Sequence, residues 1–347
     1  MLKWNQWLAG CSSKRLFWPV AALLAIILFN IFFTKGFIHL EIRDGHLFGS
    51  LVDILNRAAP VLILAIGMTL VIGTGGVDLS VGAVMAIAGA VSALLIRPDY
   101  LKGMLEYSQA PPLFIIVGAS LLAAIAAGLW NGFIVAYLNI QPMVGTLILM
   151  VAGRGIAQLI TQGQILIFVN KEFQFIGSGF FLGLPFSLTI VAILFGATYW
   201  LTRKTAAGLY IESVGDNPTA SRYAGINARL VMLLVYTFSA FCAGVAGLIV
   251  TSDIKGADAN NAGLNMELDA ILSVVIGGTS MLGGRIFLAG SIVGALFIQT
   301  LTTTILTRGV NPEFTLVVKA IVVIMVCLLQ SANFRQSIVG KMRRIAQ

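Results

Sequence analysis

The sequence predicts an all-α integral membrane protein in which residues 1–347 form a single transmembrane domain. Hydrophobic residues make up 58% of the 347 residues, charged residues make up only 10%, and the mean hydropathy is +0.95. A soluble domain of this length does not have such a composition, whereas a bundle of membrane helices does. The apolar residues also gather in runs separated by short polar segments, which is typical of a chain that crosses the bilayer many times.

About ten apolar runs are candidate spans, and some are shorter than the ~20 residues that cross a bilayer unaided. The first run follows two basic residues, as in a signal peptide, but it is long enough to span and no cleavage site follows it, so we expect it to be retained. Gly128-xxx-Gly132 and Gly290-xxx-Gly294 are candidate helix contacts, although any one such pair is more often incidental. The runs are 16–33, 54–73, 77–96, 113–138, 143–162, 186–201, 229–251, 269–282, 286–306 and 315–332.

The distribution of basic residues orients the chain. With both termini in the cytoplasm (N-in/C-in), the predicted inner segments hold more than half of the 22 Lys and Arg residues. The net charge of +8 therefore reflects orientation, and we expect no nucleic-acid partner.

Cys11, Cys242 and Cys327 have neither disulfide nor metal-ligand spacing, so we expect no metal site.

Residues 203–229 are a long polar interruption between two spans, on the cytoplasmic side by the count of spans. Asp216 or Asn217 can cap a short helix, Pro218 suits its first position, and Gly225 suits the residue after its end. The chain has no Gly-xxxx-Gly-Lys-Ser/Thr phosphate-binding loop. We therefore interpret the capped helix as a surface that a partner grips.

Two glycine clusters, 73–82 and 277–284, interrupt the helical pattern, and each follows a run that ends in Val-Ile-Gly. Such interruptions at matching places in two halves indicate a transport pathway, because irregular backbone at membrane depth needs protein or a water-filled cavity around it. Asp78 or Ser80 could cap a half-helix there, with a tight turn at the cytoplasmic surface as an equal alternative. The pathway candidates are Asp78, Ser80, Asn131, Arg154, Gln158, Thr279 and Ser280.

Arg154 is the most unusual of these candidates, because an arginine inside a span is costly and generally has a partner or a role. We favour a structural tie between helices over a place in the pathway. The sequence has no catalytic constellation, which argues against a membrane-embedded enzyme acting on lipid. Acids inside the spans are limited to Asp269 and Asp78, near the span ends, which argues against an ion-coupled secondary carrier.

Three motifs resemble those of the permease subunits of bacterial ABC sugar importers of the ribose type: residues 76–82, 215–226 and 268–284. They occur in the family's order and extend over most of the chain. Residues 44–50, 53–60 and 255–263 are similar to permeases of galactofuranose importers, whereas the N-terminus and residues 97–112 show no such likeness.

The resemblance implies a non-enzymatic subunit of the bacterial inner membrane that works with an ATPase subunit, a periplasmic sugar-binding protein and a second permease. A heterodimer is expected, with a homodimer as the alternative, surrounded by membrane lipid. This chain would bind no cofactor, since the ATPase uses ATP and Mg. The substrate would be a neutral monosaccharide, galactofuranose, with ribose or another pentose or hexose as the alternative. The implied ATPase-coupling residues are Gly215, Asp216, Asn217, Pro218, Ala220, Arg222, Ala224 and Gly225.

Overall fold

Helices account for most of the residues that the computed structural model describes, which are 16–34, 36–43, 45–97 and 110–330. This confirms the predicted all-α class. Cys11 and the terminal segments 1–15 and 331–347, which carry part of the orientation argument, lie outside the described residues. The helices are α2 (Phe17–Phe33), α3 (Ser50–Gly73), α4 (Val81–Ile96), α5 (Leu113–Ala136), α6 (Pro142–Thr161), α7 (Lys171–Ser178), α8 (Phe186–Lys204), α9 (Ala206–Asp216), α10 (Pro218–Tyr223), α11 (Ala228–Asp253), α12 (Met266–Ile276), α13 (Leu288–Thr307) and α14 (Pro312–Gln330).

A helix occupies each of the ten apolar runs. Six of these helices, α3, α5, α6, α8, α11 and α13, are long and apolar enough to cross a membrane by length and composition. α2, α4 and the Phe314–Val326 part of α14 are apolar but shorter. α12 ends at Ile276, although the predicted run continues to 282, because the chain adopts positive φ angles at Gly278, Gly283 and Gly284.

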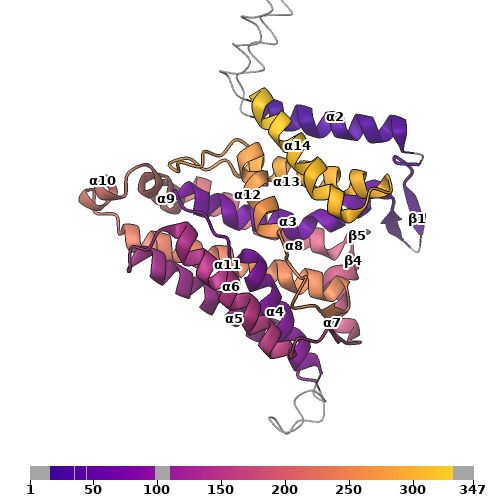
Figure 1. Cartoon of the computed structure of the whole chain (residues 1–347), viewed down its shortest axis with the longest axis horizontal. Helices are drawn as coiled ribbons and strands as arrows, with labels where there is room; N and C mark the ends of the chain where they lie inside the picture. The colour runs from indigo at the N-terminus through magenta and orange to yellow at the C-terminus, as the bar shows by residue number, and fades with distance from the viewer. Residues whose placement is uncertain (1–15, 35, 44, 98–109, 331–347) are drawn as a thin grey trace, which may run out of the picture.

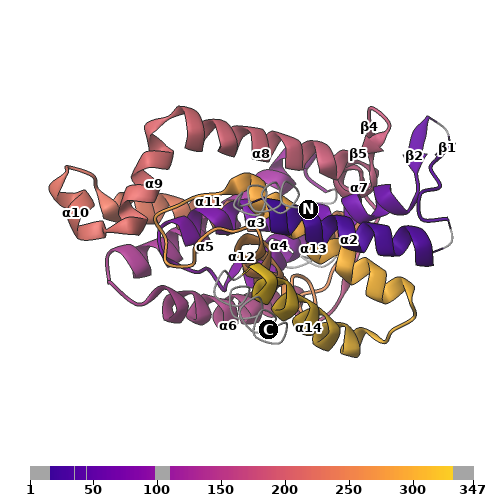
Figure 2. The ribbon, with the colours of Figure 1, turned by 90° about the horizontal axis from the view of Figure 1, so that it is seen from above.

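α3 and α11 pack together at the centre of the bundle (Figures 1 and 2). From Ala58 to Gly73, every residue of α3 is buried. A helix that is apolar on all sides is stable only when other helices surround it. α11 also packs against α4 and α5, while α12 and α13 cover another side of α3.

Both predicted glycine pairs lie at helix contacts. A Cβ atom on Gly128 would come within 2.8 Å of Thr237 Cα, so α5 and α11 approach closely there. A Cβ atom on Gly294 would overlap the carbonyl oxygen of Ser273, which joins α13 to α12. The other member of each pair is confined in the same way. Small residues allow this backbone contact. Both candidates are therefore helix contacts, and the expectation that a given pair is incidental is wrong for these two.

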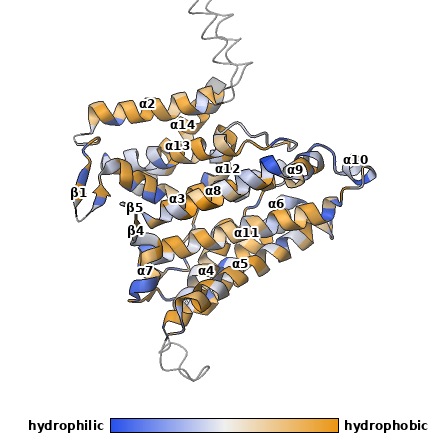
Figure 3. Cartoon of the chain, turned by 180° about the vertical axis from the view of Figure 1, so that it is seen from behind, coloured by the Kyte–Doolittle hydropathy of each residue, from blue (hydrophilic) through white to orange (hydrophobic). Residues whose placement is uncertain are grey.

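The two ends of the molecule differ. α9 and α10 lie at one end, whereas α7 and two strand pairs lie at the opposite end (Figures 1 and 2). The helices between them are largely hydrophobic, and hydrophilic residues gather toward the ends (Figure 3). The antiparallel strand pairs are β1 (Glu41–Arg43) with β2 (His46–Phe48), β4 (Phe180–Phe181) with β5 (Leu184–Pro185), and β3 (Leu166–Ile167) with β6 (Gly256–Ala257).

Candidate functional site

The chain between α3 and α4 is buried although it is not helical. Asp78 and Ser80 are both 0% exposed. The Asp78 carboxylate accepts hydrogen bonds from the backbone N–H of Ser80 (3.0 Å), from Ser80 Oγ (2.7 Å) and from Ser239 Oγ (3.0 Å). Ser80 occupies the N-cap position of α4, but its hydroxyl makes no capping bond and donates to Asp78 instead. The segment is therefore an irregular stretch inside the bundle and not an exposed turn.

Two further helices hold the same stretch. Asn131 Nδ2 of α5 donates to Ser80 Oγ at 2.7 Å, and Thr146 Oγ1 of α6 accepts the next backbone N–H after Asp78 at 3.2 Å. Three predicted pathway candidates thus form one hydrogen-bonded group. Sequence reasoning misses Ser239 and Thr146, because a hydroxyl residue in an apolar helix usually bonds only its own backbone.

Two polar atoms beside this group, Asn131 Oδ1 and Tyr236 OH, have no hydrogen-bond partner among the described residues. Both side chains are buried, with exposures of 0% and 1%. A Cβ atom on Gly76 would overlap the Tyr236 hydroxyl, so the chain passes very close to this side chain. Because an unsatisfied buried polar atom costs about 1–3 kcal/mol, we expect these atoms to meet water or the hydroxyl of a ligand.

The second glycine cluster carries the other two pathway candidates. Thr279 is 4% exposed, and its Oγ1 has no partner within the described part of the chain. Ser280 is exposed, and its Oγ accepts the N–H of Leu282 at 3.2 Å. Across the described residues, neither hydroxyl is hydrogen-bonded to the Asp78 group. The two glycine clusters lie at matching places in the two halves of the chain, but Thr279 and Ser280 are therefore not part of the hydrogen-bonded group around Asp78.

The two glycine clusters meet each other and the end of α9 at Gly215. The N–H of Gly284 donates to the carbonyl oxygen of Gly73 at 3.1 Å. A Cβ atom on Gly215 would overlap that oxygen and lie 2.6 Å from the Gly284 nitrogen. A Cβ atom on Gly283 would lie 2.8 Å from both the Gly215 oxygen and the Gly75 nitrogen. The two glycine clusters and the first residue of the 215–226 motif therefore converge at one backbone contact.

Side chains reinforce this junction. Arg203 Nη2, in the last turn of α8, donates to the carbonyl oxygen of Ile286 at 2.8 Å. Glu212 Oε1 of α9 accepts the N–H of the same residue at 3.0 Å. The backbone N–H and carbonyl of Ile286, just after the second glycine cluster, are thus both hydrogen-bonded to the α8–α9 segment. A displacement of α9 would pull directly on the start of α13.

α10 confirms the predicted caps. Asn217 is the N-cap, and its Oδ1 accepts the N–H of Ala220 at 2.9 Å. Pro218 is the first helical residue, and Gly225 follows the helix with a φ of +85°. Asp216 is the last residue of α9, so its alternative assignment as the cap is wrong. Apart from Ser221, the helix is exposed, as are the flanking coupling residues Asp216, Asn217, Ala224 and Gly225, and it projects at the end of the molecule (Figures 1 and 2).

α9 itself is not predicted from the sequence, which indicates one short helix in this segment. Thr205 caps α9, because its Oγ1 accepts the N–H of Ala207 at 3.2 Å. Gly208, Ile211 and Val214 form its buried face. This stripe is too short, and too interrupted by glycine, to stand out as an amphipathic pattern.

Arg154 and Gln158 lie away from this site and hold a loop. Arg154 Nη1 donates to the carbonyl oxygens of Ala259 and Ala262 at 3.0 and 2.6 Å, and Gln158 Nε2 donates to Asn260 Oδ1 at 2.7 Å. The arrangement favours a structural tie, although it joins α6 to a loop rather than to another helix. In that loop, burial opposes ionisation of Asp258, but hydrogen bonds from its asparagine neighbours and the Arg154 charge outweigh this and lower its pKa.

No group of three or more His, Cys, Asp or Glu that could hold a metal ion occurs among the described residues.

The chain is similar to known permeases. It is 52% identical over 334 residues to the galactofuranose transporter permease protein YtfT of Escherichia coli K12, and the matched region covers 94% of each chain. It is 39% identical over 333 residues to the fructose import permease protein FruF of Bifidobacterium longum NCC 2705, which covers 94% of this chain and 90% of that one.

A third relative is the ribose import permease protein RbsC of Haemophilus influenzae Rd, with 33% identity over 283 residues, 80% of this chain and 84% of that one. No solved structure matches the chain. Residues 50–327, from the start of α3 into α14, match the family described as the branched-chain amino acid transport system / permease component. The resemblance to the permeases of ABC sugar importers is therefore confirmed, and the chain belongs to this family of membrane permease subunits, which are not enzymes themselves.

Proposed function

We propose that this chain is the transmembrane subunit of an ATP-driven importer that carries the neutral monosaccharide galactofuranose across the bacterial inner membrane. The main support is the 52% identity, over 94% of both chains, with a galactofuranose transporter permease. Identities of 39% and 33% to fructose and ribose permeases make another hexose or pentose the second candidate. The proposal includes one domain, ten spans in the N-in/C-in orientation, and a second, different permease. ATP and Mg belong to the partner ATPase.

In this proposal, residues 215–225 receive the motion of the ATPase. The properties of α10 support this role, because the helix is capped, exposed and at the end of the molecule. An ATPase that grips α10 moves α9 with it, and α9 carries Gly215 against both glycine clusters. Because α9 contacts both glycine clusters, its displacement would move both clusters together. A small displacement of this kind can change the packing of whole helices.

We further propose that Asn131 Oδ1 and Tyr236 OH face the sugar pathway, because they are buried polar atoms without a described partner. Asp78 and Ser80 position the break between α3 and α4, since their polar atoms are already bonded within the protein. Thr279 is a pathway candidate for the same reason as Asn131. Arg154 and its neighbour Gln158 fix the outer loop that would receive the sugar-binding protein.

The test is reconstitution of the complete importer in liposomes, with uptake of labelled galactofuranose, ribose and fructose measured side by side. We expect galactofuranose uptake that requires ATP and the binding protein and persists when an uncoupler collapses the proton gradient. Preferential uptake of ribose or fructose would overturn the choice of sugar. Uptake without ATP that stops with the uncoupler would overturn the mechanism in favour of an ion-coupled carrier.

A further inference from the structure

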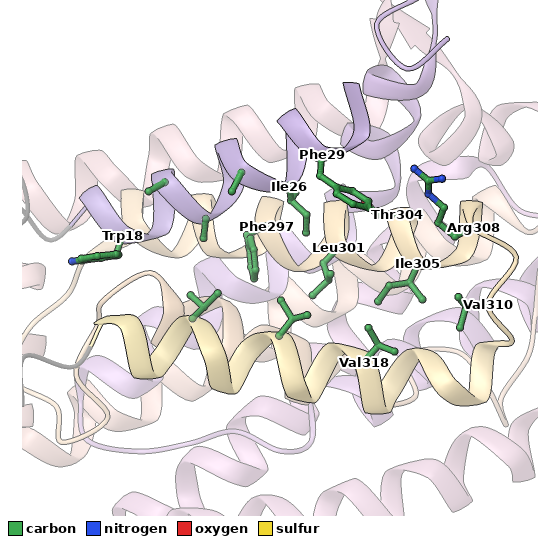
Figure 4. A pocket seen from close by; sticks show the side chains of 15 residues that line it. Trp18, Ile26, Phe29, Phe297, Leu301, Thr304, Ile305, Arg308, Val310 and Val318 are labelled. Carbon is green, nitrogen blue, oxygen red and sulfur yellow. The ribbon is translucent and has the colours of Figure 1, made fainter. Parts of the chain in front are cut away.

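A groove of about 600 Å³ separates α2 from α14, with α13 as its floor (Figure 4). The wall formed by α2 is built around Ala22 and Ala25, and valines such as Val318 and Val322 line the opposite side. The hydroxyl of Thr304, in the floor, is already satisfied by hydrogen bonds with Asn30 and with its own helix. The groove therefore offers hydrocarbon surface and little to attract water.

The length of the groove corresponds to one leaflet of a bilayer. Trp18 lies at one end, and Phe29 lies near the other, beside Arg308 (Figure 4). At about 1.5 Å per helical residue, Trp18 and Phe29 are about 16 Å apart along α2. This is close to half of the ~30 Å hydrocarbon core. A single acyl chain of one leaflet thus matches the groove in length as well as in polarity.

A positive charge stands at one mouth of the groove. The guanidinium of Arg308 lies over the rings of Phe29 and Phe33, with 5.4 and 5.9 Å to their centroids, and Nη2 donates to Thr34 Oγ1 at 3.4 Å. Arg308 is exposed, and no carboxylate among the described side chains pairs with it. These contacts hold its remaining N–H donors at the mouth, where they can bind a phosphate.

We propose that this groove binds an anionic phospholipid, with one acyl chain between α2 and α14 and the phosphate at Arg308. The lipid fills the space where α2 and α14 diverge and so fastens both helices to α13. Loss of the lipid lowers the thermal stability of the subunit, because in the described part of the chain α2 is held mainly by α13 and, less closely, by α14. The proposal concerns the membrane environment of the subunit and does not depend on which sugar it carries.

The test is native mass spectrometry and thermal unfolding of the purified, delipidated importer with added phosphatidylglycerol or phosphatidylcholine. We expect phosphatidylglycerol to be retained preferentially and to raise the Tm. Arg308→Gln should weaken its retention about tenfold, as for the loss of one charge-assisted contact, and Arg308→Lys should restore much of it. Val322→Phe and, independently, Ala25→Leu should block the groove and abolish retention without changing charge. Arg229→Gln is the matched control, because Arg229 is an exposed arginine over the ring of Tyr137, outside the groove.

Equal retention of the two lipids, or undiminished retention by Arg308→Gln, would overturn the proposal. Cysteines placed at Ala25 and Val322 address the competing occupant, a helix of the second permease. Efficient cross-linking of either cysteine to that subunit would show that protein fills the groove, whereas labelling by a lipid-soluble maleimide that phosphatidylglycerol slows would support the lipid.

Discussion

Replacement of Gly215 by alanine tests the junction on which the coupling mechanism depends. The new methyl group would overlap the Gly73 carbonyl oxygen and lie 2.6 Å from the Gly284 nitrogen, between the partners of a 3.1 Å hydrogen bond. All of these atoms belong to backbone, which yields less readily than a flexible side chain. Overpacking of about 1–3 kcal/mol and one lost hydrogen bond of about 1 kcal/mol give a local cost of about 2–4 kcal/mol. The cheapest relief is displacement of α9 away from both glycine clusters.

We therefore expect Gly215→Ala to insert and assemble but to import little sugar for each ATP hydrolysed. The assay compares ATP hydrolysis, stimulated by the binding protein, with uptake of labelled sugar in the same liposomes. Gly196→Ala in α8 is the matched control, because a Cβ atom there meets nothing within 4 Å and the change even favours the helix by up to about 1 kcal/mol. If Gly215→Ala imports sugar at the normal rate per ATP, the junction does not transmit the motion.

The remaining predictions concern the cap, the buried carboxylate of Asp78 and a partly buried ion pair between Lys319 and Asp269. Replacement of Asn217-Pro218 by Gly-Gly should leave insertion intact but uncouple transport, because α10 loses its cap and its first residue; the same liposome assay measures this. Asp78→Ala should lower the free energy of unfolding by about 2–3 kcal/mol, because the buried hydroxyls of Ser80 and Ser239 lose the acceptor to which they donate, and a normal Tm would contradict this. Lys319→Met should destabilise by about 1–3 kcal/mol, because it leaves the carboxylate of the partly buried Asp269, 2.9 Å away, without its partner; adding Asp269→Leu should recover most of the Tm.

Much of the fold follows from local chemistry. The apolar runs predict a helix at each of ten places, because a backbone inside a membrane must satisfy its own hydrogen bonds. The cap at Asn217 and the stop at Gly225 are also readable, since a cap depends on residues only a few positions apart. α9 is missed because its buried face is set by the helices it meets, and its own pattern is too short to indicate one.

The sequence alone indicated a helical membrane protein with two glycine interruptions and one short, capped helix between spans. It also indicated that Arg154 needs a partner, but not which one, because the backbone carbonyls it meets are carried by every residue. Only the tertiary structure decided that Gly73, Gly215 and Gly284 touch. A glycine signals that something approaches closely, yet the approaching segment lies far along the chain and is chosen by the packing of whole helices.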